Sequence, residues 1–304
     1  PSKSYHSSYL NINQIKLNFF FNNFLSSYTR IIHVSITKSF FTNFLGPPLL
    51  VENDAHINCL SLNNYSTTQI FTESDLCIDS CTFSDCQNKG WYVKGGAIYF
   101  VNKDSTLKIH ATIFENCLCQ GDGGAVYASL EKGDANTGGS FFSHYCCYSG
   151  CTAEIVEPNN KQYSGYGSAI FVVSTNIELN YSSSIECPKG SSSYGAQFDL
   201  QTDDVKSCFI NATNGDSVCC AAIEYRNAKS GFFSYQTIVD QIGGFVTSFT
   251  TLIGPVNISS CNFVNNTIRF TDFVPNCSLI HVRVKSVLIS KFVVIETNFD
   301  GFDS

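Results

Sequence analysis

The feature that most constrains this chain is a short strand pattern that recurs five times along its 304 residues. Each copy has an alanine after a small residue, followed by two residues of which at least one is aliphatic or aromatic. The copies are Gly95-Gly96-Ala97-Ile98-Tyr99, Gly123-Gly124-Ala125-Val126-Tyr127, Gly167-Ser168-Ala169-Ile170-Phe171, Tyr194-Gly195-Ala196-Gln197-Phe198 and Cys220-Ala221-Ala222-Ile223-Glu224. From alanine to alanine the steps are 28, 44, 27 and 26 residues. Such a period predicts an array in which each repeat is one supersecondary unit stacked on the next.

A second pattern alternates with the first, an aromatic residue followed two to four places later by Asn or Cys. It occurs at Phe83-Ser84-Asp85-Cys86, Phe114-Glu115-Asn116-Cys117, Phe142-Ser143-His144-Tyr145-Cys146, Phe209-Ile210-Asn211 and Phe263-Val264-Asn265-Asn266. An asparagine here suits a left-handed turn and can hydrogen-bond to the coils above and below. The Gly-Gly pair suits a tight turn, and the alanine suits close backbone approach. The 44-residue step predicts a polar loop that projects near residues 154–165.

Composition favours strands over helices. The chain has 26 Phe and 15 Tyr, charged residues are only 14% of it, and Met is absent. Its apolar runs are short and rich in β-branched residues, without long helical periodicity. We therefore expect an all-β chain that forms one elongated solenoid over residues 1–304, with the repeats clearest in 80–270. Which strand face points inward stays open, because both faces carry apolar residues.

These Gly-Gly-Ala-Ile and Phe-x-x-Asn repeats resemble those of the polymorphic outer-membrane protein family, surface proteins of certain bacteria with related arrays on some parasitic protists. The resemblance implies a right-handed parallel β-helix of the pectin-lyase-like type, here with about ten coils, displayed outside the cell and associated with adhesion. The sequence departs from the family pattern at Ala221, which replaces a glycine, at Glu224, where an aromatic is expected, and where Cys replaces Asn. These departures concern single coils.

Both ends of the sequence suggest a piece of a longer protein. Pro1 is not an initiator, and Asn298-Phe299-Asp300-Gly301 begins another aromatic pattern without its strand. No run of 18 apolar residues and no signal peptide is visible. We expect membrane attachment only through segments outside this chain.

Fifteen cysteines recur mostly near the aromatic pattern, about one coil apart. Stacked coils bring equivalent positions within the Cα separation that a disulfide needs, and Cys86 with Cys117 is the first pair to test. The alternative is a ladder of buried thiols. Paired zinc spacing and a local Cys-His pattern are both missing, so neither a metal site nor a catalytic cysteine is expected.

Six asparagines match the N-glycosylation sequon: Asn64, Asn180, Asn211, Asn257, Asn265 and Asn276. A chain rich in Asn, Ser and Thr also produces sequons by chance. We favour Asn64, Asn180 and Asn257 over Asn211 and Asn265, because the latter two belong to the aromatic pattern and are candidates for a buried ladder.

The charge and the motifs of the sequence exclude some classes of function. The formal net charge is −7 and the basic residues are scattered, which argues against nucleic acid as a partner, and no motif calls for a cofactor. The leading hypothesis is a non-enzymatic, extracellular cell-surface adhesin or binding scaffold. Its partner would be a protein or glycan on a host cell or neighbouring cell, contacted by an exposed strand face or by the loop Glu154–Gly165.

Two other hypotheses remain. A polysaccharide lyase or hydrolase on the same fold would use Asp203 and Asp204, which should then converge with Arg226 or Lys229 in one groove. Without such convergence the two aspartates belong to a solvated turn. The third hypothesis is a structural stalk that has no specific ligand.

Overall fold

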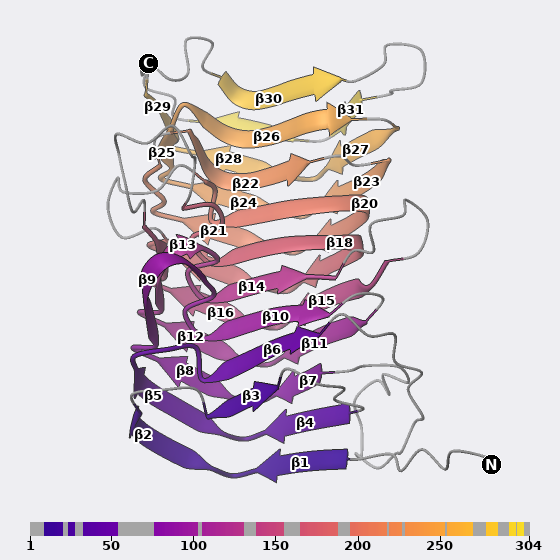
Figure 1. Cartoon of the computed structure of the whole chain (residues 1–304). Coiled ribbons are helices and arrows are strands. Elements are labelled where there is room, and N and C mark those ends of the chain that lie inside the picture. Colours follow the sequence, from indigo (N-terminus) through magenta and orange to yellow (C-terminus); the bar gives the residue numbers. More distant parts are fainter. Residues whose placement is uncertain are drawn as a thin grey trace, which may run out of the picture.

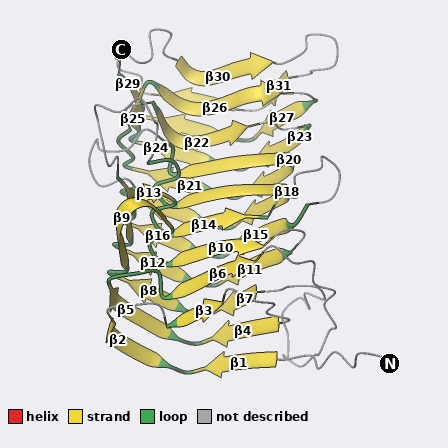
Figure 2. Cartoon of the chain, viewed as in Figure 1, coloured by secondary structure: helices red, strands yellow, loops and turns green. Residues whose placement is uncertain are grey.

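The described part of the chain is built from strands alone and forms one long stack (Figures 1 and 2). A computed structural model describes residues 9–20, 24–27, 33–53, 76–102, 105–130, 138–154, 165–187, 195–217, 219–226, 229–252, 254–269, 278–284, 292–295 and 297–300. Colours in Figure 1 run in order from indigo at one end of the stack to yellow at the other. Every strand pairing is parallel, as stacked coils require. The predicted parallel β-helix is confirmed.

Each coil contributes strands to three columns. The first column holds β1 (Tyr9–Asn13), β4 (His33–Thr37), β7 (Leu76–Asp79), β11 (Thr106–His110), β15 (Ser140–His144), β18 (Ile170–Asn180), β20 (Phe198–Cys208), β23 (Ser230–Ser234), β27 (Val256–Ser259) and β31 (Phe292–Ile295). The second holds β2 (Lys16–Phe20), β5 (Phe40–Phe44), β8 (Thr82–Ser84), β12 (Ile113–Glu115), β16 (Cys147–Ser149), β19 (Ser183–Ile185), β21 (Asn211–Thr213), β24 (Thr237–Val239), β28 (Asn262–Val264) and β32 (Asn298–Asp300).

The third column joins the first, because β18 and β20 are long enough to run through both. Its other strands are β3 (Leu25–Ser27), β6 (Leu49–Asn53), β10 (Ile98–Asn102), β14 (Val126–Ser129), β22 (Cys220–Arg226), β26 (Phe245–Leu252) and β30 (Ser278–Val284). Short strands pair between the second and third columns: β13 (Leu118–Asp122) pairs with both β9 (Gln87–Lys94) and β17 (Thr152–Ala153), and β25 (Ile242–Gly243) pairs with β29 (Thr267–Ile268).

Two sharp corners with left-handed backbone border the second column in eight successive coils, from the coil of β5 to that of β28. The first corner is occupied by Lys38, Ser80, Ala111, Tyr145, Tyr181, Phe209, Tyr235 and Ser260, all with positive φ. Five residues later the second corner is occupied by Asn43, Asp85, Asn116, Gly150, Glu186, Asn214, Asp240 and Asn265, again with positive φ. The N–H groups of most corner residues donate to a carbonyl of the following coil, for example Tyr145 to Asn180 at 3.1 Å. The corners therefore fix where every coil turns.

The aromatic pattern supplies the stack inside the second column. Phe41, Phe83, Phe114 and Tyr148 lie in successive coils with ring centroids 4.9 to 5.0 Å apart and nearly parallel planes. Tyr148, and not Phe142, therefore holds the interior position of its coil. The left-handed asparagines expected from the pattern are present at Asn116 and Asn265, and Asn43 is another. The expectation is wrong for Asn211, which lies in strand β21, whereas Asn214 is the left-handed asparagine of that coil.

The small residues pack where coils approach most closely. A Cβ atom on Gly96 would overlap the carbonyl oxygen of Gly124 in the next coil, and Gly95 has a φ of +67°. The alanines of the pattern are fully buried. The alignment by alanine is wrong by one residue in the fourth repeat, because Phe198 pairs with Ile170 and Gln197 takes the place of the alanine. Gln197 fits there because its buried side chain donates to the carbonyl oxygen of Thr213, 3.2 Å away.

The inward face, left open by the sequence, is the one that carries Ile98, Val126, Ile170, Phe198 and Ile223. The neighbouring residues Tyr99, Tyr127 and Phe171 stack on the outer face of the third column, with centroids 5.3 to 5.5 Å apart. The loop predicted near residues 154–165 lies largely outside the described residues.

Candidate binding surface

Four aromatic rings stack on the outside of the molecule at the first corner. We call Tyr145, Tyr181, Phe209 and Tyr235 the corner ladder. Successive ring centroids lie 4.8, 4.7 and 4.7 Å apart, and the planes are within 7° of parallel. The exposed fractions of the four residues, in order, are 56, 48, 44 and 54%. The ladder is therefore a continuous exposed aromatic surface across four coils.

The backbone makes this surface unusual. Bulky side chains at positive φ are rare because Cβ crowds the carbonyl oxygen, at a cost of about 1 to 2 kcal/mol per residue. The same corner carries Ser80, Ala111 and Ser260 in other coils. Small side chains are thus compatible with the corner, and folding by itself does not require the four rings. Stacking offsets part of this cost, by about 0.5 to 1.5 kcal/mol per pair.

The residues one before and two after the corner ladder include no Lys, Arg, Asp or Glu, although the carboxylate of Glu178 contacts two of them, His144 and Asn180. The residues one before the corner are His144, Asn180, Cys208 and the buried Ser234, and the residues two after it are Cys147, Ser183, Asn211 and Thr237. Aromatic rings bordered by hydroxyl and amide groups combine apolar contact with hydrogen bonding. Such a composition is typical of recognition surfaces rather than of solvated turns.

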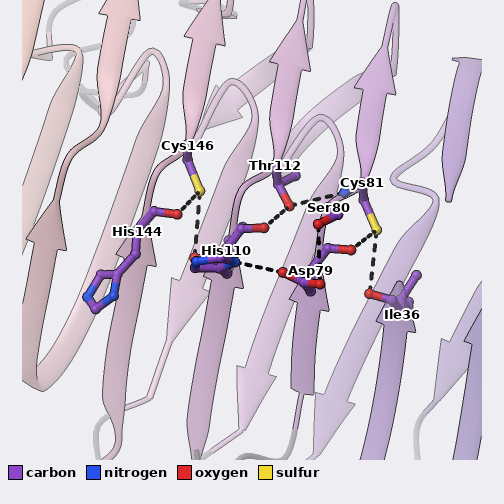
Figure 3. Close-up of polar contacts among 9 residues, drawn as sticks. Ile36, Asp79, Ser80, Cys81, His110, Thr112, His144 and Cys146 are labelled. Carbon is purple, nitrogen blue, oxygen red and sulfur yellow. Dashed lines mark hydrogen bonds and ion pairs between the residues drawn. The ribbon is translucent and has the colours of Figure 1, made fainter. Parts of the chain in front are cut away.

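Two neighbouring histidines, His110 and His144, lie at one end of the ladder. His110 and His144 are in register on β11 and β15, and Nδ1 of His110 lies 2.7 Å from Oδ1 of Asp79 (Figure 3). The His110 ring packs edge-on against Tyr145, with centroids 5.5 Å apart. Burial lowers the pKa of His144, and although Glu178, 3.2 Å away, acts in the opposite direction, the net shift is downward. We therefore expect a neutral imidazole at His144 at pH 7.

Figure 3 also shows how the residue after the first corner fastens one coil to the next. Oγ1 of Thr112 donates to the carbonyl oxygen of His110 at 2.8 Å. Sγ of Cys81 donates to the carbonyl oxygens of Asp79 and Ile36, at 3.2 and 3.4 Å. These contacts satisfy strand carbonyls at the turn, so the thiols act there as hydrogen-bond donors.

The structure separates the two aspartates of the enzyme hypothesis. Asp203 forms an ion pair with Lys229, with 2.7 Å between Oδ2 and Nζ. Asp204 accepts a hydrogen bond from Ser230. Arg226 bonds to other carboxylates, so among the described ion pairs the two aspartates do not share a cation. Asp203 therefore meets Lys229, one of the two cations named in that hypothesis, whereas Asp204 meets Ser230.

A different charged cluster lies on the outer face of the third column, and the sequence reasoning missed it. Asp199 and Glu224 are in register on β20 and β22, and Nη2 of Arg226 donates to both, at 2.7 and 3.1 Å. The Tyr166 ring lies 4.5 Å from the guanidinium carbon. Asp199 has no exposed surface, and its Oδ1 atom has no hydrogen-bond partner.

The protonation of this cluster follows from its geometry. Two carboxylates compete for one guanidinium, and burial raises the pKa of Asp199 well above its usual value. Burial alone would lower the pKa of Arg226, but Asp199 and Glu224 outweigh it and raise that pKa. We infer a neutral Asp199 beside a charged Arg226. The only sequence signal was Glu224, which departs from the aromatic expected there.

Four cysteines form a ladder inside the second corner. Cys86, Cys117, Cys151 and Cys187 follow this corner in successive coils and are fully buried. The backbone N–H of Cys151 donates to Sγ of Cys187 at 3.1 Å. Burial raises the pKa of the Cys117, Cys151 and Cys187 thiols well above the usual value.

The two cysteines of the predicted disulfide lie next to each other, but the disulfide is not formed in this structure. Cys86 and Cys117 lie in adjacent coils, and both are free thiols, as are the other described cysteines. The buried-ladder alternative therefore describes the arrangement observed. The pairing of Cys86 with Cys117 under oxidising conditions stays a prediction.

The described sequons differ in the accessibility of their amide nitrogens. Asn211, Asn257 and Asn265 are exposed. Asn180 is half-buried, and its Nδ2 atom donates to Oε1 of Glu178 at 2.6 Å. Its Oδ1 atom accepts from the backbone N–H of Cys208 at 3.2 Å. We now favour the three exposed sites over Asn180. Asn64 and Asn276 lie outside the described residues.

Within the described ranges, His, Cys, Asp and Glu do not gather into a group of three or more able to hold a metal ion. The same ranges contain no helix that is long and apolar enough to cross a membrane. Comparisons with protein-family models, curated proteins and solved structures find no match to this chain.

Proposed function

We propose that this chain is a non-enzymatic, extracellular binding scaffold that acts as an adhesin, with the corner ladder as its contact surface. The single observation that carries the proposal is the ladder itself: four exposed, stacked rings at a corner where other coils carry Ser, Ala or Lys. Aromatic side chains dominate recognition surfaces because they bring a large contact area with little loss of side-chain entropy.

The solenoid supports this role by its rigidity. Each coil is bonded to its neighbours through parallel strands, so residues at equivalent positions form straight rows along the stack. Such rows create extended surfaces in repeat proteins, whereas the inward-facing residues are committed to packing. The placement on a cell surface, and a partner on a host or neighbouring cell, rest on the family resemblance.

Binding to cells tests the proposal. The secreted chain is compared by flow cytometry on epithelial cells with a variant that carries Tyr181→Ser and Phe209→Ser. Serine suits this corner, because Ser80 and Ser260 adopt the same backbone. We expect saturable binding by the natural chain and about tenfold weaker binding by the variant.

A matched control separates the ladder from general apolar stickiness. Phe232 on β23 is 46% exposed, against 44% for Phe209, and belongs to a flat strand face outside the ladder. Phe232→Ser should leave binding unchanged. Equal losses in both variants, or no saturable binding by the folded natural chain, contradict the proposal and favour a structural stalk.

A further inference from the structure

The two ends of the corner ladder differ, and this difference points to a ligand. At one end the Tyr145 ring meets the edge of His110, with 5.5 Å between centroids. At the other end, one face of Tyr235 stacks on Phe209 at 4.7 Å. Its opposite face points toward the next coil, where the corner residue is Ser260. Because serine has no ring, the aromatic ladder ends at Tyr235.

Exposure agrees with an open face at Tyr235. The two end rings, Tyr145 and Tyr235, are 56 and 54% exposed, whereas Tyr181 and Phe209, which have a ring on both sides, are 48 and 44% exposed. The backbone continues the corner without a break, because φ is 53° at Tyr235 and 52° at Ser260. The corner position next to Tyr235, at Ser260, therefore continues the ladder and lacks only an aromatic side chain.

The groups around this place are hydroxyls and an amide. In register with Ser234 and Thr237, the next coil presents Ser259 and Asn262 on either side of Ser260. Asn262 is exposed, and the two serines are half-buried. None of these side chains is charged. The site thus combines a flat ring face with neutral hydrogen-bonding groups.

We propose that the open face of Tyr235 is a stacking site for one sugar ring of a neutral glycan. The face of an aromatic ring carries negative potential and attracts the weakly positive C–H groups on the flat side of a pyranose. Hydroxyls at the rim of that pyranose match the donors and acceptors of Ser259, Ser260 and Asn262. The absence of Lys and Arg at these positions argues against phosphate or acidic sugars. This inference rests on the proposed function and narrows it to one ligand class.

A direct binding measurement tests the site. Saturation-transfer NMR with the full chain uses neutral methyl glycosides, namely glucose, galactose, mannose, fucose and the two N-acetylhexosamines. Ser260→Tyr fills the site with the ring that the ladder lacks and leaves Tyr235 in place. We expect binding of at least one glycoside, weakened about five- to tenfold or more by Ser260→Tyr and by Tyr235→Ser.

Ala111→Tyr is the matched control. Ala111 occupies the same corner, with a φ of 46°, at the opposite end of the ladder. The control adds a ring far from the site, so glycoside binding should be unchanged. Binding of no glycoside, or equal binding by Ser260→Tyr, overturns the inference. So does capture of N-acetyl-phenylalanine amide in place of every glycoside, since that indicates a protein partner.

Periodate treatment of the cells distinguishes the two proposals. Oxidation of surface glycans should abolish binding of the natural chain if a sugar is the ligand. Saturable binding that persists on oxidised cells, and that still requires Tyr181 and Phe209, leaves the adhesin proposal standing and overturns the glycan inference.

Discussion

Single residues explain why the coils pack so closely. Gly96 lies where a Cβ would overlap the backbone carbonyl of Gly124, which is held by its own strand and cannot move away easily. Gly96→Ala should therefore lower the free energy of unfolding by about 2 to 3 kcal/mol through overpacking. Urea denaturation followed by circular dichroism measures the change. Ser129→Ala, on the half-buried edge of β14, should alter it by less than about 0.5 kcal/mol. A change for Gly96→Ala that is no larger contradicts the packing described.

Asp199 makes the stability depend on pH. Its folded pKa is raised by burial, so the folded state binds the proton more tightly than the unfolded chain does. The contribution of the protonated Asp199 carboxyl to the free energy of unfolding is fully present below the unfolded pKa of about 3.9. It is lost as the pH rises through the pKa of Asp199 in the folded state. The free energy of unfolding should therefore fall less steeply above about pH 4 in Asp199→Asn than in the natural chain. Parallel slopes for the two proteins, from denaturation at several pH values, would show that Asp199 is charged in the fold.

The sequence reveals some residue roles and conceals others. The Gly-Gly turns and the left-handed asparagines were predictable, because glycine and asparagine are the residues that tolerate positive φ. The corner ladder was not, because its Tyr and Phe occupy a backbone conformation that ordinarily excludes them. The sequence does contain one signal for the ladder, an aromatic residue that recurs five residues before the second corner. This recurrence can be recognised only after the coils have been aligned with one another. Arg226 was considered only as a partner of Asp203 and Asp204.

At the scale of elements, the buried cysteine ladder should differ in reactivity from the half-buried cysteines. Burial raises the pKa of Cys117, Cys151 and Cys187, which keeps them as thiols and out of reach of reagents. Iodoacetamide at pH 8 should alkylate Cys147 and Cys208 well before these three, as peptide mass spectrometry can determine. In denaturant all should react alike. Early labelling of the ladder contradicts the packing, and recovery of Cys86 joined to Cys117 would establish the predicted bridge.

The strand register was only partly predictable. Aligning the repeats on their alanines predicts the correct lengths of the first coils. This follows because the residues after those alanines, Ile98, Val126 and Ile170, are in register in the structure. The alignment was wrong in the fourth repeat, where Gln197 rather than Ala196 takes the equivalent position. A buried glutamine with local partners is not expected from composition. Periodicity thus predicts the fold, whereas exact register depends on side-chain contacts between neighbouring coils.

At the scale of the molecule, the parallel β-helix turns corner residues distant in sequence into one straight surface (Figure 1). A binding scaffold of this kind needs no active-site groove. If a partner contacts the corner ladder, the opposite faces of the stack remain free. The position of this contact on the molecule is therefore what needs to be measured.

Photo-crosslinking measures this position most directly. A photoreactive phenylalanine derivative is placed at Phe209 in one protein and at Phe232 in another, two positions of nearly equal exposure. After irradiation on epithelial cells, crosslinked cell-surface material is measured on gels for each protein. The account predicts crosslinks from position 209 and few from position 232. Equal crosslinking from both positions, or crosslinking from 232 alone, would contradict the corner ladder as the contact surface.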